Sequence, residues 1–564
     1  MKLQLVLARA LAPVAVIAAA TLGACGDDTK KGATDSQADS DVVDNETAAE
    51  VAEETTPEVI EEVTPPFSPQ AKIYRVDPIT TPNLEQVELE HLTSTDHTLV
   101  GAYARVRSCT PDLARGKKIP LDLGGFQIDV VSCVPESKAL PGDDGTYLAI
   151  APPATPAADD GRFAEVMMYH HMQVIHDYYK DVHGLTDRDS PLDAITNVQA
   201  NVCGDWAMIA NAAFIPDGGL DQLGFDLDLD INGDSIIFSG TSKRNFSYDG
   251  VVIYHEYTHA MLGATRLNAA FVDDQGINNL PGALNESYAD YFAGTITNQS
   301  AIGNYALNDL EGISICGFSL GAGGDAGRDM EVDKTCPNDL TAQVHADSEI
   351  FSSALWEIRK QLGQTDADRV ILSSVLTLTN TSDFTLAAAA TIDAADELLG
   401  ADATAKVEQA FMDRGLIDCQ RVLPVGRVGQ RGLPVTLESK DAFSPNPFPG
   451  YAPGYLQYSF VVPEGTATIT LAINAAGGGG GPLGGGGDGP ILTAVFKPGS
   501  QPVRYTLGFA AGSGKHNGQF ELPVVAGKVV IASGDLPPDP GTWTFALHNS
   551  GGSGSLSKIT ATFE

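Results

Sequence analysis

Residues 251–262 read VVIYHEYTHAML, an apolar run that contains the motif H-E-x-x-H. On a helix, residues four positions apart lie on one face, so His255 and His259 can direct both imidazole rings at one metal ion. Glu256 is one step further round the helix and reaches beside that ion. Five letters with three fixed also arise by chance, and the alternative is a helix with two ordinary histidines.

The residue types of this motif suit a catalytic zinc ion. Zinc binds neutral imidazole nitrogen and carboxylate oxygen, and a catalytic site keeps three protein ligands and one open position for water. Zinc lowers the pKa of bound water to about 7, so a nearby carboxylate can accept its proton at neutral pH. We therefore predict that His255 and His259 bind zinc and that Glu256 is the general base.

A second stretch, PGALNESYADYFAG at residues 281–294, supplies the rest of such a site. Its large apolar residues recur at helical spacing, which places Glu286 and Asp290 four positions apart on one face. We predict that Glu286 is the third zinc ligand and that Asp290 accepts the second ring N–H of a ligating histidine. A solvated acidic helix face is the alternative.

HEYTH followed by NESYAD resembles the gluzincin metallopeptidases of the thermolysin and fungalysin type. The resemblance implies a zincin catalytic domain with a β-rich N-terminal lobe and a helical C-terminal lobe, Zn2+ as cofactor, and a peptide or protein substrate. NAAF at residues 211–214 resembles the edge strand that holds the substrate backbone, which implies substrate contacts at Asn211 and Ala212. QVHADSEIFSSALWEI at residues 343–358 resembles the segment whose histidine stabilises the transition state, here His345.

Two further points of comparison concern substrate binding. Arg328 has the place along the chain of the arginine that contacts a substrate carbonyl in the thermolysin family, although the surrounding letters differ. We treat it as a substrate-binding candidate, with an ordinary surface arginine as the alternative. No tyrosine stands between His259 and Glu286, where these enzymes place an oxyanion donor, so His345 is expected to carry more of that role.

Residues 1–25 have the pattern of a secretory signal, with an early lysine, a short apolar run and small residues before a cysteine. LGAC at residues 22–25 resembles a bacterial lipobox, which implies an acylated Cys25 and an exported lipoprotein at the outer membrane or cell surface, or facing the periplasm. Secretion after cleavage near Ala24 is the alternative. Residues 26–66 are rich in Asp, Glu, Thr, Ala and Pro, a composition that predicts a disordered linker.

A chain of 564 residues is too long for a single core. Short alternating runs predict a β-rich part over residues 67–160, and the motifs place the metallopeptidase domain at residues 161–420. Residues 421–564 alternate again between turns, which predicts a β-sandwich or jelly roll. Its last stretch, GTWTFALHNSGGSGSLSKITATFE, resembles the P-domains of secreted peptidases. The predicted fold class is multidomain α+β, a zincin domain followed by an all-β domain.

The formal net charge of -39 argues against nucleic acid and against anionic membranes as partners. Binding to phosphate groups needs clustered Lys and Arg, which an acidic chain does not offer. We therefore expect contact with a membrane only through the N-terminal lipid anchor, and we attribute the acidity to solubility.

Once Cys25 is set aside, six cysteines remain in a chain that we expect to be exported. This even number predicts up to three disulfides. Six cysteines allow 15 pairings, and the spacing does not select among them. Proximity along the chain favours Cys109 with Cys133 and Cys316 with Cys336.

DLDLDINGD at residues 226–234 partly matches a calcium-binding loop through Asp228, Asp230 and Asn232. The Glu expected at the twelfth position is absent, and Ser239 stands there. The alternation of this stretch also reads as a half-buried strand, so Ca2+ is a second cofactor candidate beside that alternative.

The function predicted from these observations is that of an exported zinc endopeptidase in which Glu256 activates water. Two alternatives stay open. One is a surface adhesion or binding lipoprotein that keeps a gluzincin shell without activity, and the other is a non-peptidase zinc hydrolase on the same scaffold.

Overall fold

The structure is a computed structural model of the whole chain. It describes residues 67–564 apart from 123–126, 209, 220–228, 232, 264–266, 268–270, 274, 309–312, 316–317, 321–326, 342, 429–430, 433–455, 478–489, 504–518, 533–538 and 550–553. The predicted signal, Cys25 and the acidic linker lie outside the described residues. Among the helices of the described ranges, none combines the length and the apolar character that a membrane span requires.

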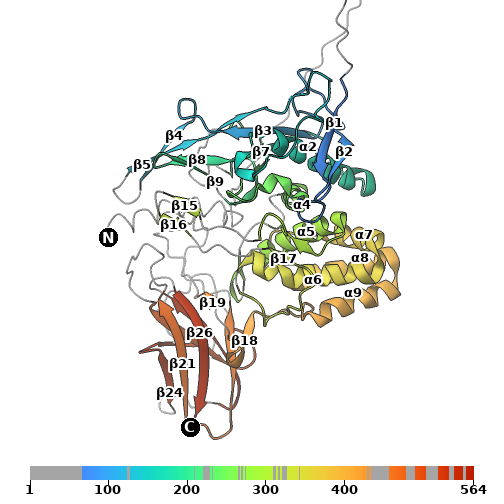
Figure 1. Cartoon of the computed structure of the whole chain (residues 1–564). Coiled ribbons are helices and arrows are strands. Elements are labelled where there is room, and N and C mark those ends of the chain that lie inside the picture. The colour runs from blue at the N-terminus through green and yellow to red at the C-terminus, as the bar shows by residue number, and fades with distance from the viewer. Residues whose placement is uncertain are drawn as a thin grey trace, which may run out of the picture.

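The N-terminal region is built from strands, as its alternating sequence predicts (Figure 1). Its strands are β1 Gln70–Tyr74, β2 Leu84–Glu88, β3 Ala104–Thr110, β4 Lys118–Asp122, β5 Gln127–Ser132, β6 Val134–Glu136, β7 Leu192–Thr196, β8 Gln199–Val202, β9 Asp205–Met208, β10 Ala212–Ile215 and β11 Ser235–Phe238. β1 and β2 form a separate antiparallel pair, and β4-β5-β8-β9 form an antiparallel sheet.

The five-stranded sheet has the order β10-β11-β7-β3-β6, with β7 parallel to both of its neighbours. β10 is therefore an edge strand, as the sequence predicted for residues 211–214. It pairs antiparallel with β11 from Ala212 opposite Phe238 to Ile215 opposite Ser235.

Helix α2, Arg162–Asp177, contacts β3 and β7 of this sheet and also the motif helix α4. It follows the short 3-10 helix η1, Pro156–Ala158, and continues into a π-helical turn η2, Tyr178–Val182. Its histidines are packed rather than grouped around an ion: His171, for example, contacts the hydroxyl of Tyr254 and the carbonyl of Tyr74 at 2.7 and 3.1 Å.

The second region is helical and carries the motifs (Figure 1). Its helices are η3 Phe246–Tyr248, α4 Gly250–Leu262, α5 Leu280–Thr297, α6 Val344–Leu362, α7 Gln364–Val375, α8 Phe384–Leu399 and α9 Ala401–Asp413. Short strand pairs join them: β12 Phe271–Asp273 with β13 Gly276–Asn278, β14 Ala301–Ile302 with β17 Arg328–Asp329, and β15 Ile313–Ile315 with β16 Phe318–Leu320.

Local sequence signals set the ends of the two motif helices. Asp249 caps α4, because its Oδ1 accepts hydrogen bonds from the backbone N–H groups of Val251 and Val252 at 3.1 and 3.3 Å. Gly263 ends the helix at φ 72°, a left-handed conformation that suits glycine. All residues of α4 are buried, which agrees with a helix that is apolar all round apart from its functional groups.

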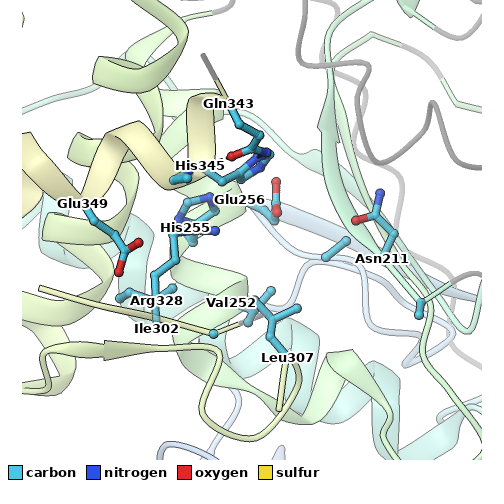
Figure 2. Close-up of a pocket in the computed structure, with 14 residues that line it drawn as sticks. Asn211, Val252, His255, Glu256, Ile302, Leu307, Arg328, Gln343, His345 and Glu349 are labelled. Carbon is cyan, nitrogen blue, oxygen red and sulfur yellow. Dashed lines mark hydrogen bonds between the residues drawn. The ribbon is translucent and has the colours of Figure 1, made fainter. Parts of the chain in front are cut away.

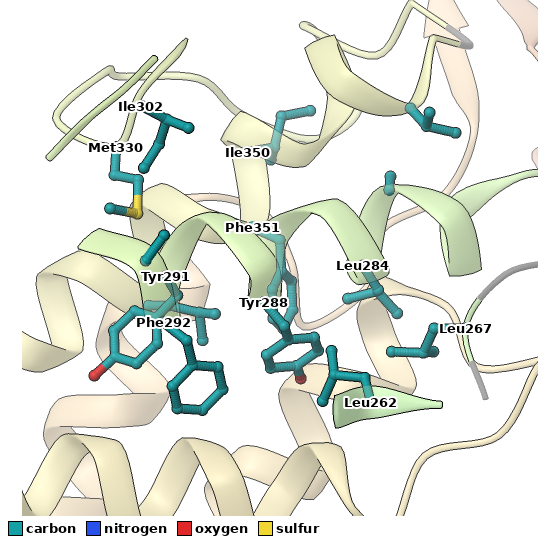
Figure 3. Packing of buried hydrophobic residues seen from close by; sticks show 14 of the residues in the cluster. Leu262, Leu267, Leu284, Tyr288, Tyr291, Phe292, Ile302, Met330, Ile350 and Phe351 are labelled. Carbon is teal, nitrogen blue, oxygen red and sulfur yellow. The ribbon is translucent and has the colours of Figure 1, made fainter. Parts of the chain in front are cut away.

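The core of the helical region is aromatic (Figure 3). Tyr288 on α5 lies 5.7 Å from the ring of Phe351 on α6, and Phe351 is also 5.5 Å from Phe384 and 5.3 Å from Phe411. Burial of each such ring stabilises the fold by roughly 2–3 kcal/mol. The apolar side of α5 thus fixes the helix while its acidic side faces α4.

The last region contains two sheets that together form the predicted β-sandwich (Figure 1). Its elements are β18 Val422–Pro424, η4 Val425–Arg427, β19 Arg431–Gly432, β20 Gln457–Val462, β21 Thr468–Gly477, β22 Leu492–Pro498, β23 Phe520–Pro523, β24 Lys528–Ala532, β25 Gly541–Asn549 and β26 Gly554–Phe563. The sheet orders are β18-β20-β25-β22-β23 and β19-β26-β21-β24. The ring of Phe460 in one sheet lies 6.1 Å from that of Phe563 in the other. The likeness of its end to P-domains stays a prediction.

Two disulfides join described residues. Cys109 pairs with Cys133, which confirms one of the two local pairings. The other was wrong, because Cys336 pairs with Cys419, 83 residues away. The tertiary structure decides which cysteine Cys336 meets, because the chain that leaves α9 returns beside the segment before α6. There, the N–H of Cys336 donates to the carbonyl of Arg414 at 2.9 Å. Cys203 is disulfide-bonded as well, and Cys316 lies outside the described residues.

We expect removal of the long-range disulfide by Cys336→Ser with Cys419→Ser to lower the free energy of unfolding of the helical region by about 4.5 kcal/mol. The chain-entropy relation for an 83-residue separation gives this value. The same relation gives about 3.5 kcal/mol for the 24-residue separation of Cys109 and Cys133, so Cys109→Ser with Cys133→Ser is the matched control.

The measurement is urea denaturation followed by far-UV circular dichroism, which reports mainly the helices. The prediction is contradicted if the Cys336 and Cys419 double variant loses less helical stability than the control double variant, because the longer loop would then not be the more stabilising one.

Candidate metal centre and active site

Three buried side chains from two helices converge at one point. His255 and His259 on α4 face Glu286 on α5, and candidate ligand atoms of all three lie within 4.8 Å of one another. His255 Nε2 is 3.3 Å from Glu286 Oε2, and His259 Nε2 is 3.6 Å from Glu286 Oε1. The spacing of four residues in H-E-x-x-H produces this convergence, because it places both rings on the α5 side of α4.

These three residues fit a zinc ion. The two Nε2 atoms lie 3.0 Å apart in a buried site, and Glu286 Oε2 has no hydrogen-bond donor among the described residues. Buried polar atoms that face one another in this way need a shared partner. Two imidazole nitrogens and one carboxylate are the donor set that catalytic zinc takes in proteins.

Asp290, one turn after Glu286 on α5, holds the opposite side of the first histidine. Its Oδ1 lies 2.9 Å from His255 Nδ1, a contact between buried ring and carboxylate that favours a proton on Nδ1 and leaves Nε2 to bind metal. Its two oxygens also accept from Arg328, Oδ2 from Nε at 2.8 Å and Oδ1 from Nη2 at 2.6 Å. Asp290 is fully buried, and this bidentate pair keeps its charge compensated.

The pKa values of Glu286 and His259 suit zinc ligands, whereas His255 has to lose a proton before it can bind zinc. Burial opposes ionisation of Glu286, but the neighbouring His345, His255 and His259 hold its pKa well below the usual range. Burial lowers the pKa of His259, which keeps that ring neutral. Burial also acts against charge on His255, yet the contacts with Asp290 and Glu286 raise its pKa to about 10. A metal ion that binds here would therefore displace a proton from His255.

Glu256 reaches from α4 to the edge strand. Its Oε2 accepts a hydrogen bond from the backbone N–H of Phe214 in β10 at 2.8 Å. This N–H points away from β11, and because backbone groups alternate along a strand, the N–H and C=O of Ala212 point to the same open side. The predicted base and the predicted substrate strand therefore lie in contact.

His345 enters the site from the first turn of α6. Its Nε2 lies 3.5 Å from Glu286 Oε2, so this nitrogen faces the zinc ligands. The charge of Glu286 favours a protonated ring, but burial and the positive charges of Arg328 and His255 together lower the pKa of His345. Gln343, which caps α6, contacts the other ring nitrogen at 2.9 Å.

His255, Glu256, Arg328 and His345 line one cavity of about 430 Å³ between the β-rich and helical regions (Figure 2). Its lining residues are Ala210, Asn211, Ala212, Val252, His255, Glu256, Ile302, Leu307, Gly327, Arg328, Gln343, His345, Ala346 and Glu349. In Figure 2, Asn211 lies on the strand side, and His255, His345 and Glu349 lie on the helical side. A volume of this size accepts a few residues of an extended peptide.

The structure brings together the predicted zinc ligands, Glu256 and His345. Two other groups of residues named from the sequence, Arg328 and the calcium candidates, need separate comment. The alternative of a surface position for Arg328 is wrong, because its side chain is 10% exposed and pairs with Asp290 on the cavity wall. Of the calcium candidates, Asp228 and Asn232 lie outside the described residues, and Asp230 Oδ2 pairs with Arg107 at 2.7 Å.

Sequence reasoning missed two contacts. One is the hydrogen bond from Phe214 to Glu256, a backbone contact without a sequence signature. The other is Gln343 on His345, for which a signal existed: Gln stands at the start of α6, where Ser, Thr, Asp or Asn is the usual cap.

Comparison with known proteins identifies the helical part of the chain. Residues 277–416, which run from β13 through α9, match a family model described as thermolysin metallopeptidase, alpha-helical domain. Among solved structures, the chain is similar to the precursor of protealysin, a metalloproteinase from Serratia proteamaculans. The identity is 16%, the match covers 58% of this chain and 96% of that chain, and the TM-score is 0.34. No curated protein matches the sequence.

The family match covers the buried Glu286 and Asp290 as well as Arg328 and His345, which line the cavity. Residues 277–416 therefore match the helical domain of thermolysin-type metallopeptidases, as the sequence motifs predicted. Proteins of this class are zinc metallopeptidases.

We expect Asp290→Asn to weaken zinc binding by about 10- to 100-fold, the usual effect of losing the partner of a metal-bound histidine. The variant also removes the bidentate anion of the buried Arg328, which keeps only the longer contact with Glu286 Oε2 at 3.6 Å, so the free energy of unfolding should fall by roughly 3–5 kcal/mol. Adding Arg328→Met should recover much of the stability but not the zinc affinity.

Competition with a chromophoric chelator measures the affinity, and urea denaturation of the metal-free protein measures the stability. Zinc affinity that returns together with stability in the double variant would show that Asp290 acts only through packing.

Proposed function

We propose that this protein is an exported zinc-dependent endopeptidase that cleaves peptide bonds in the cavity between β10 and α6. The observation that carries the proposal is that three functions lie together: a ligand set for zinc whose His255 lines the cavity, the Glu256 carboxylate beside it, and an edge strand next to that carboxylate. An extended peptide that adds to the edge of a sheet places its scissile bond beside these groups.

Zinc held by His255, His259 and Glu286 would supply Lewis-acid polarisation of the scissile carbonyl and a bound water with a pKa of about 7. The residues of the chain account for the remaining steps. Asp290 keeps His255 in the tautomer that leaves Nε2 free, and the N–H and C=O of Ala212 orient the substrate backbone.

Glu256 is the base in this mechanism. It accepts the proton of the attacking water and then donates it to the leaving amine nitrogen, so each turnover restores its charge. The hydrogen bond from Phe214 N–H holds one carboxylate oxygen, which leaves the other for the proton. Because the donor of this bond is in the edge strand, the position of Glu256 relative to a peptide bound along that strand is fixed.

Arg328 supplies positive charge, and His345 supplies a hydrogen-bond donor, where negative charge develops. A hydrogen bond from His345 Nε2–H to the oxyanion would contribute ~3 kcal/mol to transition-state stabilisation, as oxyanion donors do elsewhere. Arg328 lines the same cavity and is paired with Asp290. In the proposal, Arg328 contacts a substrate carbonyl at the cavity wall.

Export is part of this proposal and is supported by sequence and by cysteine chemistry. LGAC at residues 22–25 has the form of an acylation site, and disulfides such as Cys109–Cys133 persist mainly in oxidising compartments. We therefore place the enzyme outside the cytoplasm, held to a membrane by a lipid on Cys25.

The central test uses Glu256→Gln in the protein from Pro66 onward. We expect one zinc per chain in both forms and a loss of peptide cleavage of about 10²–10⁴-fold in the variant, the usual contribution of a general base. Quenched fluorescent peptides of mixed sequence report cleavage, and elemental analysis reports zinc. Glu357→Gln, at a half-buried position of α6 outside the cavity lining, is the matched control and should cleave at the wild-type rate.

A folded, zinc-loaded wild-type protein that cleaves no peptide in this assay would refute the endopeptidase proposal. Binding of an extended peptide without turnover would then favour the surface adhesion protein, and turnover of a small ester or amide would favour the non-peptidase hydrolase.

Export has its own test in the full-length protein with Cys25→Ala. We expect the wild type to incorporate a radiolabelled fatty acid and to sediment with membranes, and the variant to lose the label. Equal labelling of both forms, or none in either, would contradict acylation at this cysteine.

A further inference from the structure

A glutamine at the rim of the cavity contacts the side of His345 that faces away from the zinc ligands. His345 Nε2 lies 3.5 Å from Glu286 Oε2, and the other ring nitrogen, Nδ1, lies 2.9 Å from Gln343 Nε2. Figure 2 shows Gln343 and His345 side by side above His255 and Glu256. This inference builds on the proposed function, in which His345 is the oxyanion donor.

The orientation of the Gln343 amide is fixed by a backbone group. Its Oε1 accepts the N–H of Ala346 at 2.6 Å, as the N-cap of α6. With its oxygen so engaged, the amide presents its NH2 group to the ring, and the flipped amide would set NH2 against the N–H of Ala346, two donors together. His345 Nδ1 must therefore accept a hydrogen bond, and the ring proton is on Nε2.

The backbone that carries Gln343 is itself held in place. Its N–H donates to Thr341 Oγ1 at 3.2 Å, and Thr341 donates from N and from Oγ1 to Asp347 Oδ1 at 2.6 and 2.7 Å. Asp347 is fully buried in the first turn of α6. Gln343 thus forms part of a closed hydrogen-bonded segment that also includes His345.

We propose that Gln343 is a positioning residue that holds His345 as the neutral tautomer with its proton on Nε2, directed at the reacting groups. A helix cap alone does not explain the residue, because Ser, Asp or Asn caps a helix at least as well and is more common there. Only a longer side chain can accept from Ala346 N–H and also donate to the His345 ring.

The tautomer matters because the two ring nitrogens have opposite roles. With the proton on Nε2, the ring donates to the oxyanion as charge develops on it. With the proton on Nδ1, a lone pair would face that charge and repel it. The contact with Gln343 thus decides whether His345 attracts or repels the negative charge of the transition state.

The direct test is nitrogen NMR of the zinc-loaded protein labelled with 15N-histidine, with the His345 signals assigned by their loss in His345→Gln. We expect Nδ1 to show the chemical shift of an unprotonated nitrogen and Nε2 that of a protonated one. A protonated Nδ1 in the wild type would overturn the inference.

Two substitutions separate the contact with His345 from the helix cap. Gln343→Ser keeps a cap for α6 but cannot reach the ring, so we expect an unchanged melting temperature, an unchanged KM and a kcat about tenfold lower. Gln343→Glu keeps the capping oxygen and replaces the donor by an acceptor, so His345 Nδ1 should become protonated. Gln361→Ser, in the last turn of α6, is the matched control and should retain the wild-type kcat.

A stable Gln343→Ser with wild-type kcat would overturn the inference, and so would Gln343→Glu with an unprotonated Nδ1. If Gln343→Ser proves less stable, the NMR spectrum of Gln343→Glu decides the matter. Failure of the proposed function gives a different result: the zinc-loaded wild type cleaves no peptide, while the NMR spectra still report which ring nitrogen carries the proton.

Discussion

The structure depends on one buried arrangement of charge, the Asp290 carboxylate between His255 and Arg328. A buried carboxylate is costly unless its oxygens are hydrogen-bonded and its charge is compensated, and Asp290 meets both conditions through these partners. The same contacts orient the His255 ring toward Glu286. The pairing of α4 with α5 and the geometry of the zinc ligands are thus a single constraint.

The remaining regions hold this arrangement in place. The aromatic side of α5 packs against α6, and β10 meets Glu256 through Phe214 N–H. The β-sandwich also contributes, because Gln457 Nε2 donates to the carbonyl of Gln275 at 3.0 Å in the β12–β13 connection between α4 and α5. In the same connection, the buried Arg421 pairs with Asp273 at 2.5 Å. The chain between the two motif helices is therefore anchored by the domain that follows them.

The sequence was sufficient for the features that local spacing controls. The period of a helix alone places His255 beside His259 and Glu286 one turn before Asp290, and alternation alone predicts the β-rich regions. Features that depend on tertiary contacts were beyond it. Cys336 meets Cys419 only because α9 returns to the start of α6, and Arg328 is buried only because Asp290 is there to receive it. Gln343 differs from these, because its contacts with His345 and Ala346 are local and its unusual place as the cap of α6 was a signal in the sequence.

The most direct test of the central claim is X-ray absorption at the zinc edge of the purified full-length protein. The account predicts about one zinc ion per chain, two histidine nitrogens at about 2.0–2.1 Å, oxygen neighbours from Glu286 and water, and no sulfur. Substitution of His255, His259 or Glu286 should change this spectrum. Sulfur neighbours near 2.3 Å, or a spectrum that all three substitutions leave unchanged, would contradict a zinc site between α4 and α5.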